Sequence, residues 1–428
     1  MSEKIPLKNV SKVIGSGITP LRSNHLYWEN GTIFWLKTEQ LGERFIYETS
    51  EKITQLAIKQ TSIKIFPKNT LSIAMYGEGR TRGNVSILKS EMTTNQACCN
   101  IVVDETKVYY EYVYYFLKTQ YENLRNLSSG VRKNLNSNDI KEFEIILPEN
   151  LSTQKQIAKV LSDLDAKIEL NNKINTELEA MAKTLYDYWF VQFDFPDANG
   201  KPYKSSGGKM VWNEALKREI PEGWEVKELG EIANFTTGKL DSNAEVQNGK
   251  YPFFTCASEP TLTDTFAFDD NVILIAGNNA SGNFHINRFK GKFNAYQRTY
   301  IVTSENPVDL EYIYQVLKTE TKLLKSQGKG SQTKFLTIGM LTGIKVYRNN
   351  IKIIDNYNKI ASSIYEKQVI IKEQNQSLSS LRDWLLPMLM NGQVSVVSTS
   401  LSANGGYVEN EGGLGMVAEG KEIYRSSK

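Results

Sequence analysis

The chain has 428 residues, enough for two or more domains, and its 40% hydrophobic and 23% charged residues are ordinary for a globular protein. A formal net charge of +3 is too small to indicate a polyanionic partner by itself. No apolar run reaches the roughly 18 residues that a membrane helix needs, and the first ten residues, MSEKIPLKNV, contain no apolar signal region. We therefore expect a cytoplasmic protein that does not contact a membrane.

The sequence lacks the usual signatures of catalytic and metal sites. Its three cysteines are Cys98, Cys99 and Cys256, its two histidines are His25 and His285, and neither set has the spacing of metal ligands. There is no P-loop, and because no two prolines are adjacent, the Asn/Asp-Pro-Pro-aromatic motif of amino-methyltransferases is also missing. We predict reduced thiols, no metal site, no cofactor of the chain's own and no catalytic residues.

Residues 1–150 have the pattern of a mixed α/β domain. Short β-rich runs such as 63–66 and 85–88 are separated by glycine-containing turns, and one clear helix covers 111–118. A basic turn follows at 131–133. We expect a sheet covered by at least one helix in this part of the chain.

A long heptad helix is predicted at 151–192. From Thr153 to Trp189, a stretch of 37 residues, apolar positions recur at alternating spacings of four and three. This helix would be about 55 Å long, too long for burial in one small domain, so we expect it to pack lengthwise on another helix. Asn171 and Asn175 occupy two seam positions, where polar residues weaken packing but fix the register.

The end of this helix carries a cluster of aromatic residues between Tyr186 and Phe195. Such a cluster is typical of core packing, and it is equally typical of a docking surface, because aromatic residues are enriched among interface anchors. The sequence leaves both interpretations open. A connector rich in Gly, Lys and Ser is predicted at 193–222.

The second half of the chain repeats the first half. The segment EYVYYFLKT at 111–119 matches EYIYQVLKT at 311–319, an offset of 200 residues. We therefore predict a second α/β domain at 223–352, a second long helix at 353–392 and a disordered tail at 393–428. Other residues matched between the halves are Gly77 with Gly277, Gln96 with Gln297, and Leu135 with Phe335.

Because the chain contains two matched heptad helices, we expect them to pair with each other within one molecule. The predicted seam consists of Leu161, Leu164, Ile168, Asn171, Asn175 and Leu178 on the first helix and Ile364, Ile371, Leu378, Leu381 and Leu385 on the second.

Loops that combine glycine with basic and amide side chains occur at corresponding places in both domains. Glycine lets a backbone approach a partner closely, arginine binds guanine edges, and asparagine or glutamine binds adenine edges. Taken singly, each loop is also typical of a solvated turn. Because these loops recur in both domains with different side chains, we favour the interpretation that the two domains share one backbone arrangement and differ in the side chains that contact bases. The predicted DNA contacts are Arg80, Arg82 and Arg132 in the first domain and Asn278, Asn279, Arg298, Lys329, Gln332 and Lys334 in the second.

Five further segments carry a recognisable pattern, namely LPENLSTQKQIA (147–158), LDAKIELNN (164–172), MAKTLYDYWF (181–190), GKPYKSSGG (200–208) and IPEGW (220–224). Together they resemble the specificity subunits of type I restriction-modification enzymes. The second helix is more divergent than the first, and the tail after Gly392 lies outside the resemblance.

This resemblance implies an α+β fold with two similar target-recognition domains separated by two long antiparallel coiled-coil helices. Each domain would read one half of a bipartite, asymmetric site on double-stranded DNA. The helices would set the gap and dock two methyltransferase subunits, and restriction subunits would complete the complex. Those partner subunits would use S-adenosylmethionine, ATP and magnesium.

We therefore predict a non-catalytic DNA sequence-recognition subunit. One alternative is a coiled-coil interaction scaffold that does not read DNA. A second is an enzyme, either a nuclease or a self-sufficient methyltransferase, although the only nuclease-like residues, Asp197 and Lys201, lie in the connector without an Asp/Glu-x-Lys strand.

Overall fold

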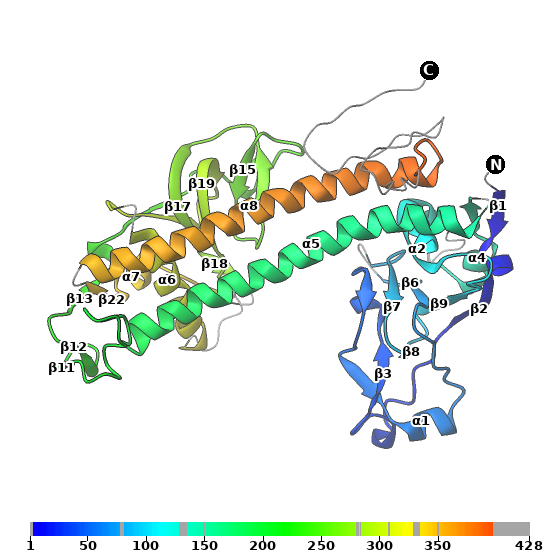
Figure 1. The fold of residues 1–428 in the computed structure, drawn as a ribbon, viewed down its shortest axis with the longest axis horizontal. Helices are drawn as coiled ribbons and strands as arrows, with labels where there is room; N and C mark the ends of the chain where they lie inside the picture. The colour runs from blue at the N-terminus through cyan, green and yellow to red at the C-terminus, as the bar shows by residue number, and fades with distance from the viewer. Residues whose placement is uncertain are drawn as a thin grey trace, which may run out of the picture. The chain divides into compact units, whose positions relative to one another are not determined.

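A computed structural model of the chain contains two long helices and two sheet-rich domains (Figure 1). The structure describes residues 3–77, 81–127, 135–148, 150–279, 282, 284–306, 309–327, 334–348 and 351–396. The chain forms two compact units, Met1–Leu170 with Gln374–Lys428, and Asn171–Glu373. Each unit contains one sheet-rich domain and a part of both long helices, which confirms the predicted α+β class.

The first unit contains a mixed domain of ten strands and four short helices among its described residues. Its strands are β1 (Glu3–Pro6), β2 (Ser11–Ser16), β3 (Ile33–Leu36), β4 (Phe45–Ile46), β5 (Glu51–Ile53), β6 (Leu71–Ala74), β7 (Val85–Leu88), β8 (Thr93–Thr94), β9 (Cys98–Val103) and β10 (Glu144–Leu147). Its short helices are α1 (Gln55–Gln60), α2 (Tyr110–Thr119), α3 (Tyr121–Asn126) and α4 (Ser137–Glu142).

The main sheet of this domain has the strand order β2-β9-β6-β7-β4, and a smaller sheet has the order β5-β3-β8. The β4–β7 and β3–β8 pairs are parallel, whereas the other pairs are antiparallel. A separate antiparallel pair, β1 with β10, joins the two ends of the domain. This pairing brings the start of the domain next to the strand that leads into the long helix.

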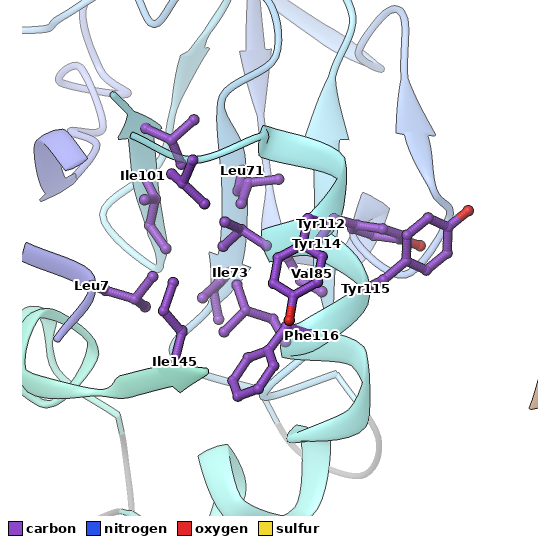
Figure 2. Packing of buried hydrophobic residues seen from close by; sticks show 14 of the residues in the cluster. Leu7, Leu71, Ile73, Val85, Ile101, Tyr112, Tyr114, Tyr115, Phe116 and Ile145 are labelled. Carbon is purple, nitrogen blue, oxygen red and sulfur yellow. The ribbon is translucent and has the colours of Figure 1, made fainter. Parts of the chain in front are cut away.

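The core of the domain lies between α2 and the main sheet (Figure 2). Leu71, Ile73 and Ile101 project from the strands, and Tyr112 and Phe116 project from α2. All five side chains are almost completely buried, and each large apolar side chain contributes about 1.5–3 kcal/mol on burial. This packing explains why the predicted helix at 111–118 is apolar over most of its surface.

The second unit repeats this arrangement. Its strands are β11 (Met210–Asn213), β12 (Arg218–Pro221), β13 (Glu225–Glu228), β14 (Asn234–Thr237), β15 (Tyr251–Phe254), β16 (Thr261–Thr263), β17 (Phe268–Ala276), β18 (Asn278–Asn279), β19 (Ile286–Ala295), β20 (Thr299–Thr303), β21 (Lys334–Phe335) and β22 (Lys345–Arg348). Its short helices are α6 (Leu310–Gln327) and α7 (Ile338–Thr342).

The sheet order β14-β20-β17-β19-β15-β16 reproduces the order β2-β9-β6-β7 of the first domain. The parallel contact of β3 with β8 recurs as the parallel contact of β15 with β19. The closing pair β1–β10 recurs as β13–β22. The internal repeat that the sequence predicts is therefore a duplication of the domain topology.

The long helices are α5 (Leu151–Tyr186) and α8 (Ile351–Met390). In the first unit Arg382 of α8 donates to Asp165 of α5 (2.8 Å). In the second unit the Gln368 amide donates to the Asn175 carbonyl oxygen (3.2 Å), and Tyr186 packs against Tyr357. The two segments are antiparallel in the second unit, because the partner that is later in α5 lies earlier in α8.

The predicted seam residues of α5 and α8 are mostly buried or half-buried. In the first unit Leu161 and Leu385 are buried, and Leu381 is 40% exposed. In the second unit Asn171 and Ile371 are buried. The remaining predicted seam residues are half-buried, namely Leu164, Ile168, Asn175, Leu178, Ile364 and Leu378.

The aromatic cluster at the end of α5 is part of the core of the second unit. The chain continues from α5 into a π-helical turn, η4 (Asp187–Val191). Phe190 and Phe193 are at most 1% exposed, and Phe190 lies 4.7 Å from Tyr312 and 5.2 Å from Tyr357 between ring centroids. This arrangement supports the core-packing interpretation of the cluster.

The short 3₁₀ helices are η1 (Leu7–Val10), η2 (His25–Tyr27), η3 (Thr38–Gln40), η5 (Leu229–Glu231) and η6 (Ser242–Ala244). None of the helices in the described part of the chain is long and apolar enough to cross a membrane.

Candidate nucleic-acid interface

Four of the nine side chains predicted to contact DNA fall outside the described residues, namely Arg80, Arg132, Lys329 and Gln332. Lys334 is described only as a backbone position in β21. The positions of Arg82, Asn278, Asn279 and Arg298 are described in full.

The second domain brings two of its predicted loops together. Asn278 and Asn279 form β18, which pairs with β21, so that Asn279 lies opposite Lys334. These positions are 55 residues apart in the sequence, yet they lie on adjacent strands of one ladder. The second domain therefore collects amide side chains and a lysine position on a single small ribbon.

Arg298 lies beside this ribbon because of two backbone hydrogen bonds. The Gly277 N–H donates to the Arg298 carbonyl oxygen (2.8 Å), and the Leu336 N–H donates to the Gly277 carbonyl oxygen (2.8 Å). Arg298 is exposed, whereas the Asn278 side-chain oxygen is buried and has no hydrogen-bond partner among the described residues. Arg298 is therefore accessible to an external polar partner, whereas the buried oxygen of Asn278 is not.

The first domain contains the same pair of backbone hydrogen bonds, made by residues with other side chains. We call this pair of hydrogen bonds the backbone frame. The Met75 N–H donates to the Ala97 carbonyl oxygen (2.8 Å), and the Leu135 N–H donates to the Met75 carbonyl oxygen (3.2 Å). Met75 therefore takes the place of Gly277, and Ala97 takes the place of Arg298.

These hydrogen bonds shift two of the residue matches inferred from the sequence. The structural counterpart of Gly277 is Met75 and not Gly77, and that of Leu135 is Leu336 and not Phe335. The match was displaced because the separation between corresponding residues changes along the chain, from 200 at the helix to 202 at this strand end.

Arg82 lies in the turn between β6 and β7 and is half-buried. A Cβ atom on the adjacent Gly83 would lie 3.2 Å from Arg125 and 3.4 Å from Tyr121, both on α3. Arg125 donates to the Tyr121 hydroxyl (2.7 Å). The turn that carries Arg82 is therefore held against a second arginine, Arg125, which the sequence-based selection did not include.

Two glycine loops that the sequence-based selection missed lie next to these frames. The Gly17 N–H donates to the Cys98 carbonyl oxygen (3.3 Å), and the Gly238 N–H donates to the Thr299 carbonyl oxygen (3.1 Å). A Cβ atom on Gly17 would lie 2.0 Å from the backbone oxygen of Thr94, and one on Gly238 would lie 2.1 Å from that of Ala295. Only glycine allows this approach of two backbones.

Each glycine loop is joined by a side-chain hydrogen bond to one of the matched glutamines. In the first domain Thr19 is bonded to Gln96, and in the second the Gln297 amide donates to Asp241 (2.8 Å). The match of Gln96 with Gln297 was visible in the sequence, but their partners were not, because they lie 77 and 56 residues away.

The first domain also contains an arginine that stacks on two tryptophans near its glycine loop. The Arg22 guanidinium lies 3.8 Å from the ring centroid of Trp28 and 4.7 Å from that of Trp35. Trp35 donates to the Ile18 carbonyl oxygen (3.1 Å), which ties this cluster to the loop. The hydrogen bond from Arg22 lowers the pKa of the Glu51 carboxyl.

The described residues contain no group of three or more His, Cys, Asp or Glu side chains that could hold a metal ion. What the two domains have in common is a surface of glycine loops, arginines and amides. This chemistry suits the recognition of base edges and phosphates.

Comparison with known proteins identifies the family. A family model for the type I restriction modification DNA specificity domain matches residues 2–180 and 221–348. The chain is 30% identical over 416 residues to the type I restriction enzyme MjaIX specificity subunit of Methanocaldococcus jannaschii, covering 91% of this chain and 93% of the relative. It is 33% identical over 181 residues to the EcoDI specificity subunit of Escherichia coli, covering 41% of this chain and 40% of that protein.

The fold is also similar to that of a solved type I restriction-modification S subunit from M. genitalium. The two chains superpose with a TM-score of 0.57 at 22% identity, covering 91% of this chain and 96% of the other. The duplicated topology and the family match over both domains lead to one conclusion: the chain belongs to the family of type I restriction-modification DNA specificity subunits.

Proposed function

We propose that the chain is the DNA sequence-recognition subunit of a type I restriction-modification complex, and that each sheet-rich domain reads one half of a bipartite, asymmetric duplex site. The observation that carries this proposal is the recurrence of one backbone frame with different side chains. Where the second domain has Gly277 and Arg298, the first has Met75 and Ala97. Two equal frames with unequal side chains are what recognition of two unequal half-sites requires.

The chemistry of the second domain fits this role. Arg298 is suited to a guanine edge and Asn279 to adenine, whereas the side-chain oxygen of Asn278 is buried. Lys334 is suited to contact a phosphate. Such a contact positions the protein on the duplex but carries no sequence information. In the first domain, Arg82 and Arg22 would supply the corresponding positive charge.

The proposed protein partners are two methyltransferase subunits and the restriction subunits. The chain would bring no cofactor of its own, and its partners would use S-adenosylmethionine, ATP and magnesium. Exposed apolar side chains on the long helices support docking of other subunits. In the first unit these are Leu170, Leu381 and Trp384, and in the second they are Met181, Ile360, Val369 and Ile370.

The salt dependence of DNA binding tests the proposal. We expect the logarithm of the binding constant to fall linearly with the logarithm of salt concentration, with a slope of about −0.9 per phosphate contact. Fluorescence anisotropy on a labelled duplex measures it, using the tagged full chain isolated together with its bound subunits. A flat slope, or no binding of duplex DNA, would favour the interaction scaffold instead.

Cysteine labelling locates the interface. Burial raises the pKa of the Cys98 and Cys99 thiols to about 12, so both remain protonated and unreactive at pH 8. Cys256 is only half-buried, and its thiol donates to the Arg298 carbonyl oxygen (3.7 Å). We expect a thiol reagent to modify one cysteine per native chain and three after unfolding in urea.

Bound DNA should slow the labelling of Cys256, because this thiol lies next to Arg298 at the proposed interface. Mass spectrometry of the labelled protein, with and without saturating duplex, gives the rate at each cysteine. An unchanged rate at Cys256 in the DNA complex would place the interface elsewhere on the second domain.

A further inference from the structure

We propose that Gln297 reads a base edge in the second half-site through its amide oxygen, and that Asp241 fixes the orientation of this amide. The inference rests on the proposed function, because it assigns a specificity-determining residue to the same interface. It adds the class of base that this residue selects, and it explains why the two domains hold matched glutamines differently.

Gln297 lies at the point where the glycine loop meets the turn between β19 and β20. Its N–H donates to the Leu240 carbonyl oxygen (3.0 Å), and its side-chain nitrogen donates to the Asp241 carboxylate (2.8 Å). The Gln297 residue is exposed, and so is the adjacent Arg298. The side chain is therefore held at its base and along one edge while it remains accessible to solvent.

The backbone below Gln297 is rigidly supported. The Tyr296 N–H donates to the Phe254 carbonyl oxygen (2.9 Å), and the Thr299 N–H donates to the Tyr296 carbonyl oxygen (2.8 Å). Thr299 is 1% exposed and lies at the start of β20. A reading side chain on such a support is positioned more accurately than one on a free loop.

The Asp241 carboxylate determines which way the amide faces. An ionised carboxylate has only acceptor oxygens, so the amide must turn its NH₂ group toward Asp241. This leaves the Gln297 oxygen and one N–H for an external partner. In the major groove, the amino groups of adenine and cytosine donate, whereas guanine and thymine offer only acceptors among their hydrogen-bonding atoms. The fixed amide therefore suits adenine best, because adenine can engage both groups, whereas cytosine engages only the oxygen and guanine or thymine only the N–H.

The first domain provides the natural comparison. Its matched glutamine, Gln96, is bonded to the Thr19 hydroxyl. A hydroxyl can donate or accept, so Thr19 is compatible with either orientation of the amide. Asp241 in place of a hydroxyl is thus the difference that commits the second glutamine to one orientation.

The test is selection of duplexes from a library with a randomised central segment, using the tagged full chain with its bound subunits. Wild type should enrich a bipartite sequence. Gln297→Ala should lose the preference at one base pair of one half-site by about 5- to 150-fold. Asp241→Thr, which copies the first domain, should broaden the preference at that same base pair to include an acceptor base. Gln247→Ala, at another exposed glutamine of this domain, should leave the enriched sequence unchanged.

The outcomes separate this inference from the proposed function. If wild type enriches no sequence, the proposed function fails and the inference fails with it. If wild type enriches a bipartite sequence that Gln297→Ala leaves unchanged, only the inference is overturned. Loss of both half-sites in Gln297→Ala would also overturn it, because a base-reading residue acts on one. Asp241→Thr without any broadening at the affected base pair would remove the orienting role of Asp241.

Discussion

Replacing Glu311 with alanine should lower the free energy of unfolding by about 3–5 kcal/mol, because it leaves a buried charge without its partner. Glu311 on α6 accepts from Arg288 on β19 at 2.7 Å, and the two side chains are only 8% and 3% exposed. Arg288 also donates to the Asn271 side chain (3.0 Å) and to the Val272 carbonyl oxygen (2.8 Å). Removing the carboxylate would therefore strand a guanidinium that is held in place by other groups.

Urea denaturation monitored by circular dichroism measures this loss. The matched control is Lys209→Ala, which breaks an ion pair with Glu222 whose side chains are 70% and 51% exposed; there we expect little or no change in the free energy of unfolding. Replacing Arg288 and Glu311 together by apolar residues of similar size should recover much of the stability. Equal effects of Glu311→Ala and Lys209→Ala would contradict the assignment of a buried pair.

Replacing Gly238 with alanine should displace the glycine loop of the second domain and weaken binding to one half-site. The new Cβ atom would lie 2.1 Å from the Ala295 carbonyl oxygen, a backbone atom within β19 that cannot rotate away. Overpacking of this kind typically costs about 1–3 kcal/mol. Because Leu240 and Gln297 are bonded across the same contact, the displacement should also move the proposed reading residue.

Gly339→Ala is the matched control for this prediction. Gly339 lies in α7, and a Cβ atom there would meet nothing within 4 Å. Gly339 is the second residue of this five-residue helix, where alanine should be tolerated or slightly stabilising relative to glycine. Urea denaturation and DNA selection on both variants provide the comparison. If Gly238→Ala behaves like Gly339→Ala, the close approach of the two backbones is not required.

The sequence was sufficient to predict the elements whose signals are local. Heptad spacing predicts α5 and α8, and the repeated helix sequence at 111–119 and 311–319 predicts the duplicated domain. The sequence alone does not decide whether the aromatic cluster after α5 is buried, because the same aromatic run is typical of a core and of an interface. Its outcome depends on Tyr312 and Tyr357, which come from α6 and α8.

The candidate interface was only partly predictable, because most of its contacts join residues far apart in the chain. Asn278 and Asn279 were selected for their chemistry, but their pairing with β21 is a tertiary contact. The close approach at Gly17 and Gly238 leaves no sequence signal beyond one glycine in each β-rich segment. The segment between β3 and β6 spans 37–70, whereas the one between β15 and β17 spans only 255–267, so no single offset aligns the two domains.

The matched glutamates Glu111 and Glu311 have a practical consequence for exchanging domains between family members. Glu311 takes its arginine from β19 of its own domain, so a transplanted second domain would carry both charges with it. Glu111 instead pairs with Arg44 (3.3 Å), which also lies near Asp165 of α5 (3.9 Å), and Asp165 pairs with Arg382 of α8. A transplanted first domain would bring Arg44 and Glu111 with it but would depend on the recipient's helices for Asp165 and Arg382. As far as this charge network is concerned, new second domains should be accepted without a matching charge in the recipient's helices, and new first domains only where the recipient retains an acidic residue at position 165.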